Sequence, residues 1–318
     1  MPENLIPPFT IGIDLGGTNT ELGIVDSQGN ILFKDRFPTA TPDFESWSDL
    51  LSEKLSNAVE GLGLQGKIAG AGIGAPCANT TTGCIEAATD LPWPSPIPLV
   101  EILEIKLGLP VVIGNDANAA SIGEMIYGSA RGVQNFIVIT LGTGVGAGIV
   151  CDGHLLNGRN GFAGELGHIT FDFAADRKCG CGRYGCLQTV ASAKGIVETA
   201  RRFGFKNPAD PDNPDFTAKD VTLAAEHGDE TAKRVFDFTG ECLGKALAQY
   251  AAFTDPEAII LFGGVANARN LLLNPTIKSF NENALHLYAG KVNINISTLK
   301  GADAAILGTA ALPYIITK

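Results

Sequence analysis

The order of apolar and polar positions predicts strands and helices in alternation. Residues 9–15 form a short apolar run typical of a buried strand, and further strands at 20–25 and 30–37 complete an antiparallel meander. Apolar residues at helical spacing over 43–64 predict a helix, and 68–73 predicts a returning strand. Strands joined by a crossover helix indicate an α/β layer.

The remaining pattern predicts a second layer of the same kind. A helix at 99–107 and a strand at 110–113 end the first half. A hairpin at 135–141 and 145–151 opens the second half with the same design as the first hairpin, so we expect a diverged copy of the first fold. The other predicted elements are helices at 187–203, 217–226, 230–253 and 270–287, strands at 258–262 and 292–296, and a closing helix at 302–315.

Length and charge narrow the class of protein. The 318 residues are enough for about two domains with sizeable cores. Acidic residues outnumber basic ones by 34 to 23, and the net charge of −11 argues against a surface built for nucleic acid or an anionic membrane. No apolar run approaches the roughly 18 residues of a membrane span, and the first residues lack an export signal. We therefore expect a cytoplasmic protein.

Glycine makes up 39 of the 318 residues, against a usual share of roughly 7%. One predicted turn is Gly16-Gly17-Thr18, which follows Asp14 at the end of a strand. Adjacent glycines let backbone N–H groups approach a phosphate, Thr18 adds a hydroxyl donor, and Asp14 offers a hard oxygen ligand for Mg²⁺. A plain hairpin turn with Asp14 bonded to the local backbone is the alternative.

Two more glycine elements follow predicted strands. Gly142-Thr143-Gly144 fits the loose pattern of dinucleotide-binding loops, but that pattern needs a helix directly afterwards and here a strand follows. We predict another hairpin turn, able to grip a phosphate as the first one does. Gly263-Gly264 ends an apolar strand and would let a flat ring lie against bare backbone, although a simple strand-to-helix turn explains it equally well.

A polar pair follows the strand at 110–113. Asn115 and Asp116 open a helical pattern, where either side chain is a good N-cap. Because a helix needs only one cap, the other side chain is free for chemistry. A carboxylate at a helix N-terminus stays ionised and can accept a proton from an alcohol. A cap without further function is the competing interpretation.

One histidine and three cysteines crowd into a short segment. His168, Cys179, Cys181 and Cys186 match a closed Cys₃His zinc site, with glycines between them that free the backbone. Because protein ligands fill all four positions, no site is left for a water, so we expect the zinc to be structural. It would clamp the loop that carries Glu165.

Together these segments resemble the ordered motifs of the ROK family, which comprises bacterial sugar kinases, mostly glucokinase-like, and related repressors. The resemblance covers nearly the whole chain and implies an α/β fold of the actin-like ATPase (ribonuclease H-like) type, with two lobes that close on a central cleft. We expect a small N-terminal lobe at 1–117, a large C-terminal lobe with the zinc loop at 118–302, and a closing helix at 303–318 that returns to the small lobe. The motifs that carry the resemblance are 14–25, 114–118, 141–146, 164–168, 179–186 and 261–264.

The resemblance also implies roles for the candidate residues. Mg²⁺ and the ATP triphosphate would be held by Asp14, Gly16, Gly17, Thr18, Gly142, Thr143 and Gly144, and the adenosine by Gly263 and Gly264. The sugar would be bound by Asn115, Asp116, Glu165 and His168, with Gly74 lining the pocket and His168 serving both zinc and sugar. Asp116 would be the general base that takes the proton of the sugar's 6-hydroxyl as it attacks the γ-phosphate.

We therefore expect an ATP-dependent hexose kinase with glucose as the leading substrate. The family's cysteine motif usually ends in a Glu that bonds a sugar hydroxyl, and Gln188 stands at that substrate-binding position here. Since an amide donates as well as accepts, fructose, N-acetylmannosamine and N-acetylglucosamine are alternative substrates. Some relatives use polyphosphate as the donor. A non-catalytic sugar sensor is the alternative from another class.

The resemblance bears on partners as well. Repressors of this family carry a helix-turn-helix domain ahead of the first glycine motif, and this sequence starts shortly before that motif. Together with the acidic charge, this predicts neither a nucleic-acid partner nor a membrane partner. The resemblance implies a homodimer or homotetramer.

Overall fold

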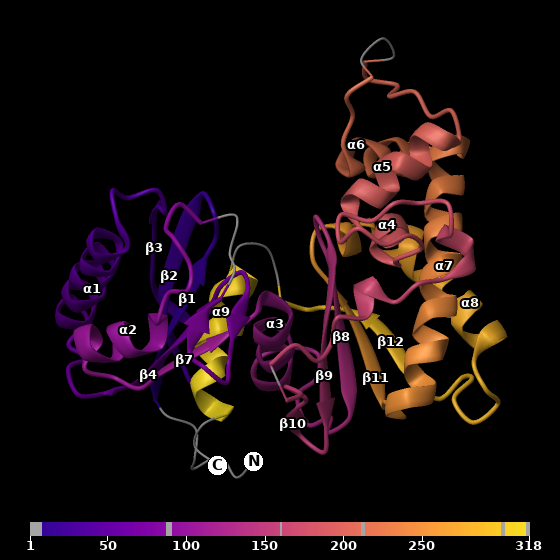
Figure 1. Ribbon diagram of the computed structural model, residues 1–318. Helices are drawn as coiled ribbons and strands as arrows, with labels where there is room; N and C mark the ends of the chain where they lie inside the picture. The colour runs from indigo at the N-terminus through magenta and orange to yellow at the C-terminus, as the bar shows by residue number, and fades with distance from the viewer. Residues whose placement is uncertain (1–7, 87–90, 160, 211–213, 300–302, 316–318) are drawn as a thin grey trace. The chain divides into compact units, whose positions relative to one another are not determined.

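The computed structural model describes residues 8–86, 91–159, 161–210, 214–299 and 303–315 (Figure 1). The chain forms two compact units, of which the first consists of Met1–Gly132, His154–Ala163 and Thr298–Lys318, and the second of Val133–Gly153 and Gly164–Ser297. The sequence analysis placed the boundary between residues 117 and 118, whereas the helix that starts at Asp116 belongs to the first unit. Residues 1–7, where an export signal would lie, and residues 302 and 316–318 of the predicted closing helix are outside the described residues.

The first unit is built on a five-stranded sheet in the order β3-β2-β1-β4-β7. The predicted antiparallel meander of its first three strands is confirmed, and the other two strands continue the sheet in parallel. The register places Asp14 opposite Gly74, and Gly74 opposite Gly114, so three parallel strands end at one edge. The strands are β1 (Phe9–Leu15), β2 (Asn19–Asp26), β3 (Ile31–Pro38), β4 (Ile68–Gly74) and β7 (Val111–Gly114).

Helices cover both faces of this sheet. Alternate residues of β1 explain why: Ile11 and Ile13 point into a core shared with α1 (Phe44–Gly61) and α2 (Leu99–Leu107), while Gly12 between them faces α9 (Asp303–Ala311). Two short strands, β5 (Ala78–Asn79) and β6 (Cys84–Ile85), form a separate hairpin that the sequence pattern did not predict. α3 (Asp116–Ile126) also belongs to this unit and packs against α9.

The C-terminal helix α9 packs directly on the sheet backbone. A Cβ atom at Gly72 would lie 1.9 Å from the carbonyl oxygen of Thr309, and one at Gly12 would lie 2.2 Å from the carbonyl oxygen of Ile306. Approach this close is possible only where the strand carries no side chain. Glycines in β1 and β4 therefore allow the last segment of the chain to complete the core of the first unit.

The second unit repeats this design. Its strands run β9-β8-β11-β12, with the first pair antiparallel and the others parallel, as in β2-β1-β4-β7. The strands are β8 (Phe136–Leu141), β9 (Val145–Cys151), β11 (Ala258–Phe262) and β12 (Asn293–Ile296). The short β10 (His154–Leu155), next in the chain after β9, is assigned to the first unit. The expectation of a diverged second copy agrees with this strand order.

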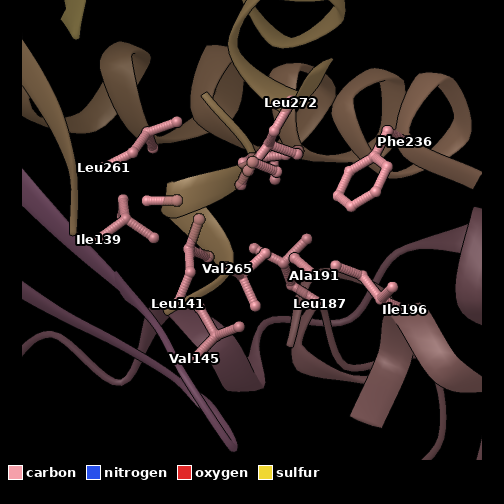
Figure 2. Close-up of a cluster of buried hydrophobic side chains, with 14 of the residues drawn as sticks. Ile139, Leu141, Val145, Leu187, Ala191, Ile196, Phe236, Leu261, Val265 and Leu272 are labelled. Atoms are coloured by element: carbon pink, nitrogen blue, oxygen red, sulfur yellow. The ribbon is translucent and has the colours of Figure 1, made fainter. Parts of the chain in front are cut away.

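Apolar side chains from strands and helices form the core of the second unit. Figure 2 shows Ile139, Leu141 and Leu261 of the sheet facing Phe236 and Leu272 of the helices, and all five are essentially inaccessible to solvent. Burial of this apolar surface is the main stabilising contribution. The long helices of the unit are α5 (Ala193–Arg202), α6 (Ala218–Glu226), α7 (Glu230–Thr254) and α8 (Asn270–Asn283).

Three predicted helices differ from the observed ones. The closing helix predicted at 302–315 ends as an α-helix at Ala311, and Leu312–Ile315 continues as a 3₁₀ turn. The predicted helix at 187–203 is broken into α4 (Gln188–Ala191) and α5, because Ser192 is extended and its hydroxyl caps the second helix by accepting from the Gly195 N–H. The predicted helix at 270–287 ends at Asn283. In the part of the chain that the structure describes, none of the helices combines the length and apolar character that a bilayer crossing requires.

Candidate active site

Two carboxylates meet at the edge where the parallel strands of the first unit end. Asp14 is the penultimate residue of β1, and Asp116 is the first residue of α3, shortly after β7. A Cβ atom built on Gly74, the last residue of β4, would lie 3.6 Å from Asp14 Oδ1 and 3.7 Å from Asp116 Oδ1. The absence of a side chain at Gly74 therefore leaves the space between the two acidic groups open.

The surroundings of these carboxylates raise their pKa values. Burial is the main cause for Asp14, whose pKa rises to about 7, and the negative charges of Asp116 and Glu21 add to it. Desolvation also raises the pKa of Asp116, although its side chain can still be reached by solvent. An excess of negative charge in a partly desolvated place is what a divalent cation balances, so Asp14 fits the role of a Mg²⁺ ligand.

Asn115 is the N-cap of α3. Its side-chain oxygen accepts a hydrogen bond from the Asn118 N–H at 2.7 Å. Asn115 is therefore the helix cap, as one of the two interpretations predicted. Because a helix needs only one cap, the carboxylate of Asp116 is not required for capping. The amide NH₂ of Asn115 remains as a donor beside Asp116.

The first glycine turn joins β1 to β2 through residues 16–18. Gly16 N–H donates to the Asn19 carbonyl at 3.1 Å. Thr39, directly after β3, braces the turn twice: its hydroxyl donates to the Gly16 carbonyl at 2.6 Å, and its N–H donates to the Thr18 carbonyl at 3.0 Å. Gly17 and Thr18 are exposed, so the tip of a braced turn is accessible.

The second glycine turn has the same three-residue length. It joins β8 to β9 through residues 142–144, and Gly142 N–H donates to the Gly144 carbonyl at 3.0 Å. β9 continues directly from Val145, antiparallel to β8, so the prediction of a hairpin turn is confirmed. The Gly142 carbonyl accepts from the N–H of Ala193, the first residue of α5, at 2.8 Å.

The third glycine element packs against the second turn. Gly263 has a φ of +101°, and a Cβ atom there would lie 2.7 Å from the carbonyl oxygen of Leu141. Gly264 borders open space. A short 3₁₀ helix, Val265–Ala268, follows directly, so the element is a strand-to-helix turn whose second glycine also leaves room for a ring.

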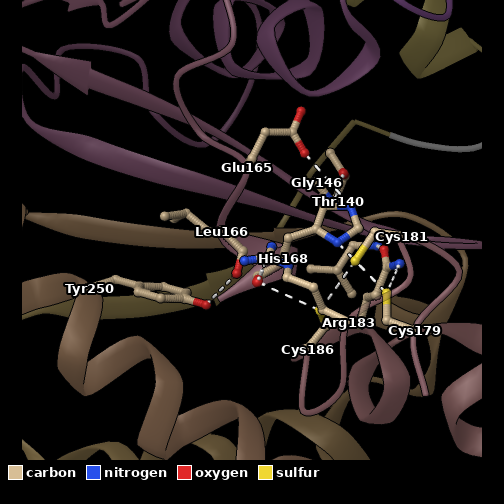
Figure 3. A network of polar contacts seen from close by, with 12 residues as sticks. Thr140, Gly146, Glu165, Leu166, His168, Cys179, Cys181, Arg183, Cys186 and Tyr250 are labelled. Atoms are coloured by element: carbon tan, nitrogen blue, oxygen red, sulfur yellow. Dashed lines mark hydrogen bonds and ion pairs between the residues drawn. The ribbon is translucent and has the colours of Figure 1, made fainter. Parts of the chain in front are cut away.

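The loop that carries Glu165 lies on the backbone of β9. Gly164 has a φ of +97°, and a Cβ atom there would lie 2.3 Å from the carbonyl oxygen of Ala147. Tyr250 of α7 holds the loop from the other side, because its hydroxyl donates to the Leu166 carbonyl at 2.7 Å (Figure 3). This packing presents the Glu165 carboxylate to solvent, with more than half of its side chain exposed.

The four predicted metal ligands converge. Cys179 Sγ lies 3.7 Å from His168 Nδ1, and Cys181 Sγ lies 3.7 Å from Cys186 Sγ, while all four ligand atoms lie within 4.8 Å of one another (Figure 3). Tetrahedral zinc, with bonds of about 2.0–2.3 Å, separates its ligands by roughly 3.5–3.8 Å. The donor set and its spacing therefore fit zinc. We refer to these residues as the Cys/His cluster.

The cluster uses only one side of the His168 ring. Because Nδ1 faces Cys179, Nε2 points away from the cluster and lies 3.9 Å from Glu165 Oε2. Arg183 closes the other side, where its guanidinium donates to the His168 carbonyl at 2.9 Å. Hydrogen bonds from Arg183 lower the pKa of Cys181 to about 6, whereas burial raises the pKa of Cys186 to about 12.

The sequence model of the ROK family matches residues 10–314, the span that holds both glycine turns, both carboxylates and the Cys/His cluster. The chain belongs to the ROK family. A glucokinase of Halalkalibacterium halodurans is 38% identical over 310 residues, which cover 94% of this chain and 92% of that protein.

Solved ROK structures share the fold. A ROK family glucokinase from Streptomyces griseus, in complex with glucose and AMPPNP, is 33% identical, with a TM-score of 0.75 over 96% of this chain and 98% of that one. A ROK hexokinase from Thermus thermophilus is 28% identical, with a TM-score of 0.80 over 97% of this chain and 99% of that one. The actin-like ATPase fold expected from the ROK motifs is thus confirmed.

The structure distributes the candidate residues of this ROK chain between its units. The first unit holds Asp14, Gly16, Gly17, Thr18, Gly74, Asn115 and Asp116, and the second holds Gly142, Thr143, Gly144, Glu165, His168, Cys179, Cys181, Cys186, Gln188, Gly263 and Gly264. Gln188, expected at a sugar-binding position, contacts Cys179 Sγ and the backbone N–H of Val145 through its side-chain amide. Its contact with a sugar hydroxyl stays a prediction.

Sequence reasoning missed a basic cavity beside the second glycine turn. This cavity of about 740 Å³ lies within the second unit and includes Thr143 and Gln188 in its wall. Five basic side chains line it, Arg177, Lys178, Lys194, Arg201 and Arg202, against two acidic ones, Asp176 and Glu198, which both pair with Arg202. The lining therefore carries a net positive charge. The signal was present, since α5 has basic residues at both ends directly after the turn's partner Ala193, but an overall charge of −11 concealed it. The bracing residue Thr39 had no sequence signal.

Proposed function

We propose that the chain is an ATP-dependent hexokinase that transfers the γ-phosphoryl group of ATP to the 6-hydroxyl of glucose. The observation that carries the proposal is the solvent-accessible carboxylate of Asp116, set at the N-terminus of α3 beside Asp14. Membership of the ROK family and the similarity to glucokinases support the choice of reaction and of sugar.

Asp116 would act as the general base. Its carboxylate accepts the proton of the sugar's 6-hydroxyl as the oxygen attacks the γ-phosphorus, and its raised pKa makes it a better acceptor near neutral pH. Mg²⁺, when it is bound with ATP, neutralises charge on the phosphoryl oxygens, and Asp14 would hold it. The amide of Asn115 would orient the sugar beside Asp116, and Gly74 would leave the space that the hydroxyl enters.

The second unit would supply the other contacts. The turn at Gly142–Gly144 would bind phosphate oxygens through backbone N–H groups and the Thr143 hydroxyl, and the neighbouring basic cavity favours anions. Gly264, which borders open space, would accept the adenosine. Because phosphoryl transfer depends on positioning and charge neutralisation, these contacts would provide most of the rate acceleration.

The Glu165 loop would bind the sugar as well. His168 Nε2 and the Glu165 carboxylate lie on the same side of the loop and are directed away from the cluster. We propose zinc as the metal of the cluster, with the structural task of fixing this loop. The cytoplasmic location and the homodimer or homotetramer expected from the sequence stay predictions.

A substrate panel tests the proposal. ADP formation from ATP and Mg²⁺ would be measured with glucose, mannose, fructose, N-acetylglucosamine and N-acetylmannosamine, using the variant Asp116→Asn as the inactive control. We expect glucose to give the highest kcat/KM. Preference for fructose or an N-acetylhexosamine would retain the kinase and correct the sugar. Sugar binding without ADP from any member of the panel would favour a sensor and contradict the proposal.

A further inference from the structure

We propose that Gln188 is a positioning residue that ties the second glycine turn to the Cys/His cluster. Its side-chain Nε2 donates to Cys179 Sγ at 3.0 Å. Its Oε1 accepts from the N–H of Val145, the first residue after the turn, at 3.4 Å. One amide thus contacts a metal ligand at one end and the turn at the other.

This double contact depends on an amide. Gln188 must donate to a sulfur and accept from a backbone N–H at the same time, which an ionised glutamate cannot do because it only accepts. A carboxylate would also place a negative charge against the Cys179 thiolate that binds the metal. The ROK motif usually has Glu at this position. The Gln that replaces it here therefore favours the contact with Cys179 of the cluster.

The backbone around Gln188 holds the turn from a second point. Gln188 begins α4, and Ala193, which begins α5, donates its N–H to the Gly142 carbonyl at 2.8 Å. The segment 188–193 thus contacts the turn before and after its tip. A Cβ atom at Gly144 would lie 3.1 Å from Gln188 Oε1, so the turn and the amide fit closely.

Two consequences follow. A metal-loaded cluster fixes Cys179, Cys179 fixes Gln188, and Gln188 fixes the turn that borders the basic cavity. Zinc occupancy would therefore influence the affinity for the nucleotide. This consequence rests on the proposed function. In addition, the side chain is engaged by the protein, so Gln188 would contribute little to sugar selection.

Zinc retention is the first readout, and it does not depend on activity. Zinc transfer from the full-length protein to a chromogenic chelator would be timed for wild type, Gln188→Glu and the similarly sized Gln188→Met. Loss of an outer-shell partner typically weakens a metal site by about 10–100-fold, so we expect faster release from both variants, with Gln188→Glu the faster. The matched control is Gln249→Glu, which adds the same charge on the exposed face of α7 and should release zinc at the wild-type rate.

Steady-state kinetics give the second readout. With zinc-saturated enzyme we expect the KM for ATP to rise about tenfold in Gln188→Met, the scale of losing one outer-shell partner, with the KM for sugar unchanged. Wild-type zinc release in both Gln188 variants would overturn the proposal, and so would a change confined to the KM for sugar. If the protein phosphorylates no sugar, the proposed function fails, and zinc release together with ATP binding by calorimetry still decides the role of Gln188.

Discussion

The proposed catalytic role of Asp116 can be tested without disturbing the helix that it begins. Because Asn115 already caps α3, replacing Asp116 by Asn removes a base without removing the cap. We expect Asp116→Asn to lower kcat by about 10²–10⁴-fold. The thermal unfolding temperature should equal or exceed that of wild type, because the variant no longer holds a desolvated negative charge beside Asp14. Steady-state kinetics and calorimetry on the same preparation would check both. A variant with full kcat would remove Asp116 from the mechanism.

Asp14 should make the stability of the ligand-free protein depend on pH. Its pKa is about 7 in the folded protein and near 3.8 in the unfolded chain. At a pH between these two values, the folded protein keeps a proton on Asp14 that the unfolded chain has released. The free energy of unfolding should therefore fall as pH rises from about 4 to 7 and stay low above pH 7, at a cost of about 2 kcal/mol after allowance for partial exposure.

The variant Asp14→Asn isolates this effect. Without magnesium and nucleotide, urea unfolding at pH 5 and pH 8 should show a smaller loss of stability in the variant than in wild type, and the variant should be the more stable protein at pH 8. It should also lose activity, because an amide is a poor ligand for Mg²⁺. Equal pH dependence in the two proteins would contradict the raised pKa.

At the scale of elements, the close packing of α9 on the sheet backbone gives the most direct prediction. A methyl group at Gly72 would meet the Thr309 carbonyl at 1.9 Å, so Gly72→Ala must displace α9. We expect the free energy of unfolding to fall by about 3 kcal/mol or more. Tryptophan fluorescence in urea is a suitable readout, since the chain's two tryptophans, Trp47 and Trp93, are both buried in the first unit.

A matched glycine offers the control. Gly61 ends α1, and a Cβ atom there would meet nothing within 4 Å. Gly61→Ala should therefore leave stability unchanged or raise it by a few tenths of a kcal/mol, up to about 1 kcal/mol, because alanine favours the helix. If both variants lose the same stability, the close approach of α9 is not what Gly72 serves.

The elements were largely predictable, and the exceptions have physical reasons. Strand periodicity located β1, β9 and β11 to the residue, because buried strands bounded by glycine or polar turns leave little freedom. The break at Ser192 escaped prediction, since apolar spacing continues through it and only the hydroxyl's bond to Gly195 shows the new helix start. The short hairpin of β5 and β6 is too brief for any periodicity to show.

The candidate site was predictable to a different degree for each kind of residue. The Cys/His cluster and the glycine turns carry their chemistry in residue type and spacing, and the structure brings the cluster's four ligand atoms together. The contacts of Gln188 depend on a fold in which segment 188–193 returns to the turn, and no spacing reveals that. The same holds for Thr39, which braces the first turn from a distant strand end.

At the scale of the whole molecule, the two units should respond differently to loss of the metal. The Cys/His cluster lies within the second unit, while both tryptophans lie in the first. Dialysis against a strong chelator should lower the midpoint of the unfolding transition followed by far-UV circular dichroism. Fluorescence from the tryptophans should shift less, and zinc should restore both signals. Identical shifts in the two signals would show that the units unfold together.

The packing of α9 on β1 and β4 also affects the order in which the two units fold during synthesis. The first unit needs residues from both ends of the sequence, because α9 covers β1 and β4, whereas the second unit is nearly continuous from Val133 to Ser297. Synthesis runs from the N-terminus, so the strands that are translated first must wait for the segment that is translated last. The second unit can therefore acquire its native core on the ribosome before the first, and a nascent chain arrested at Ser297 would expose the uncovered face of β1.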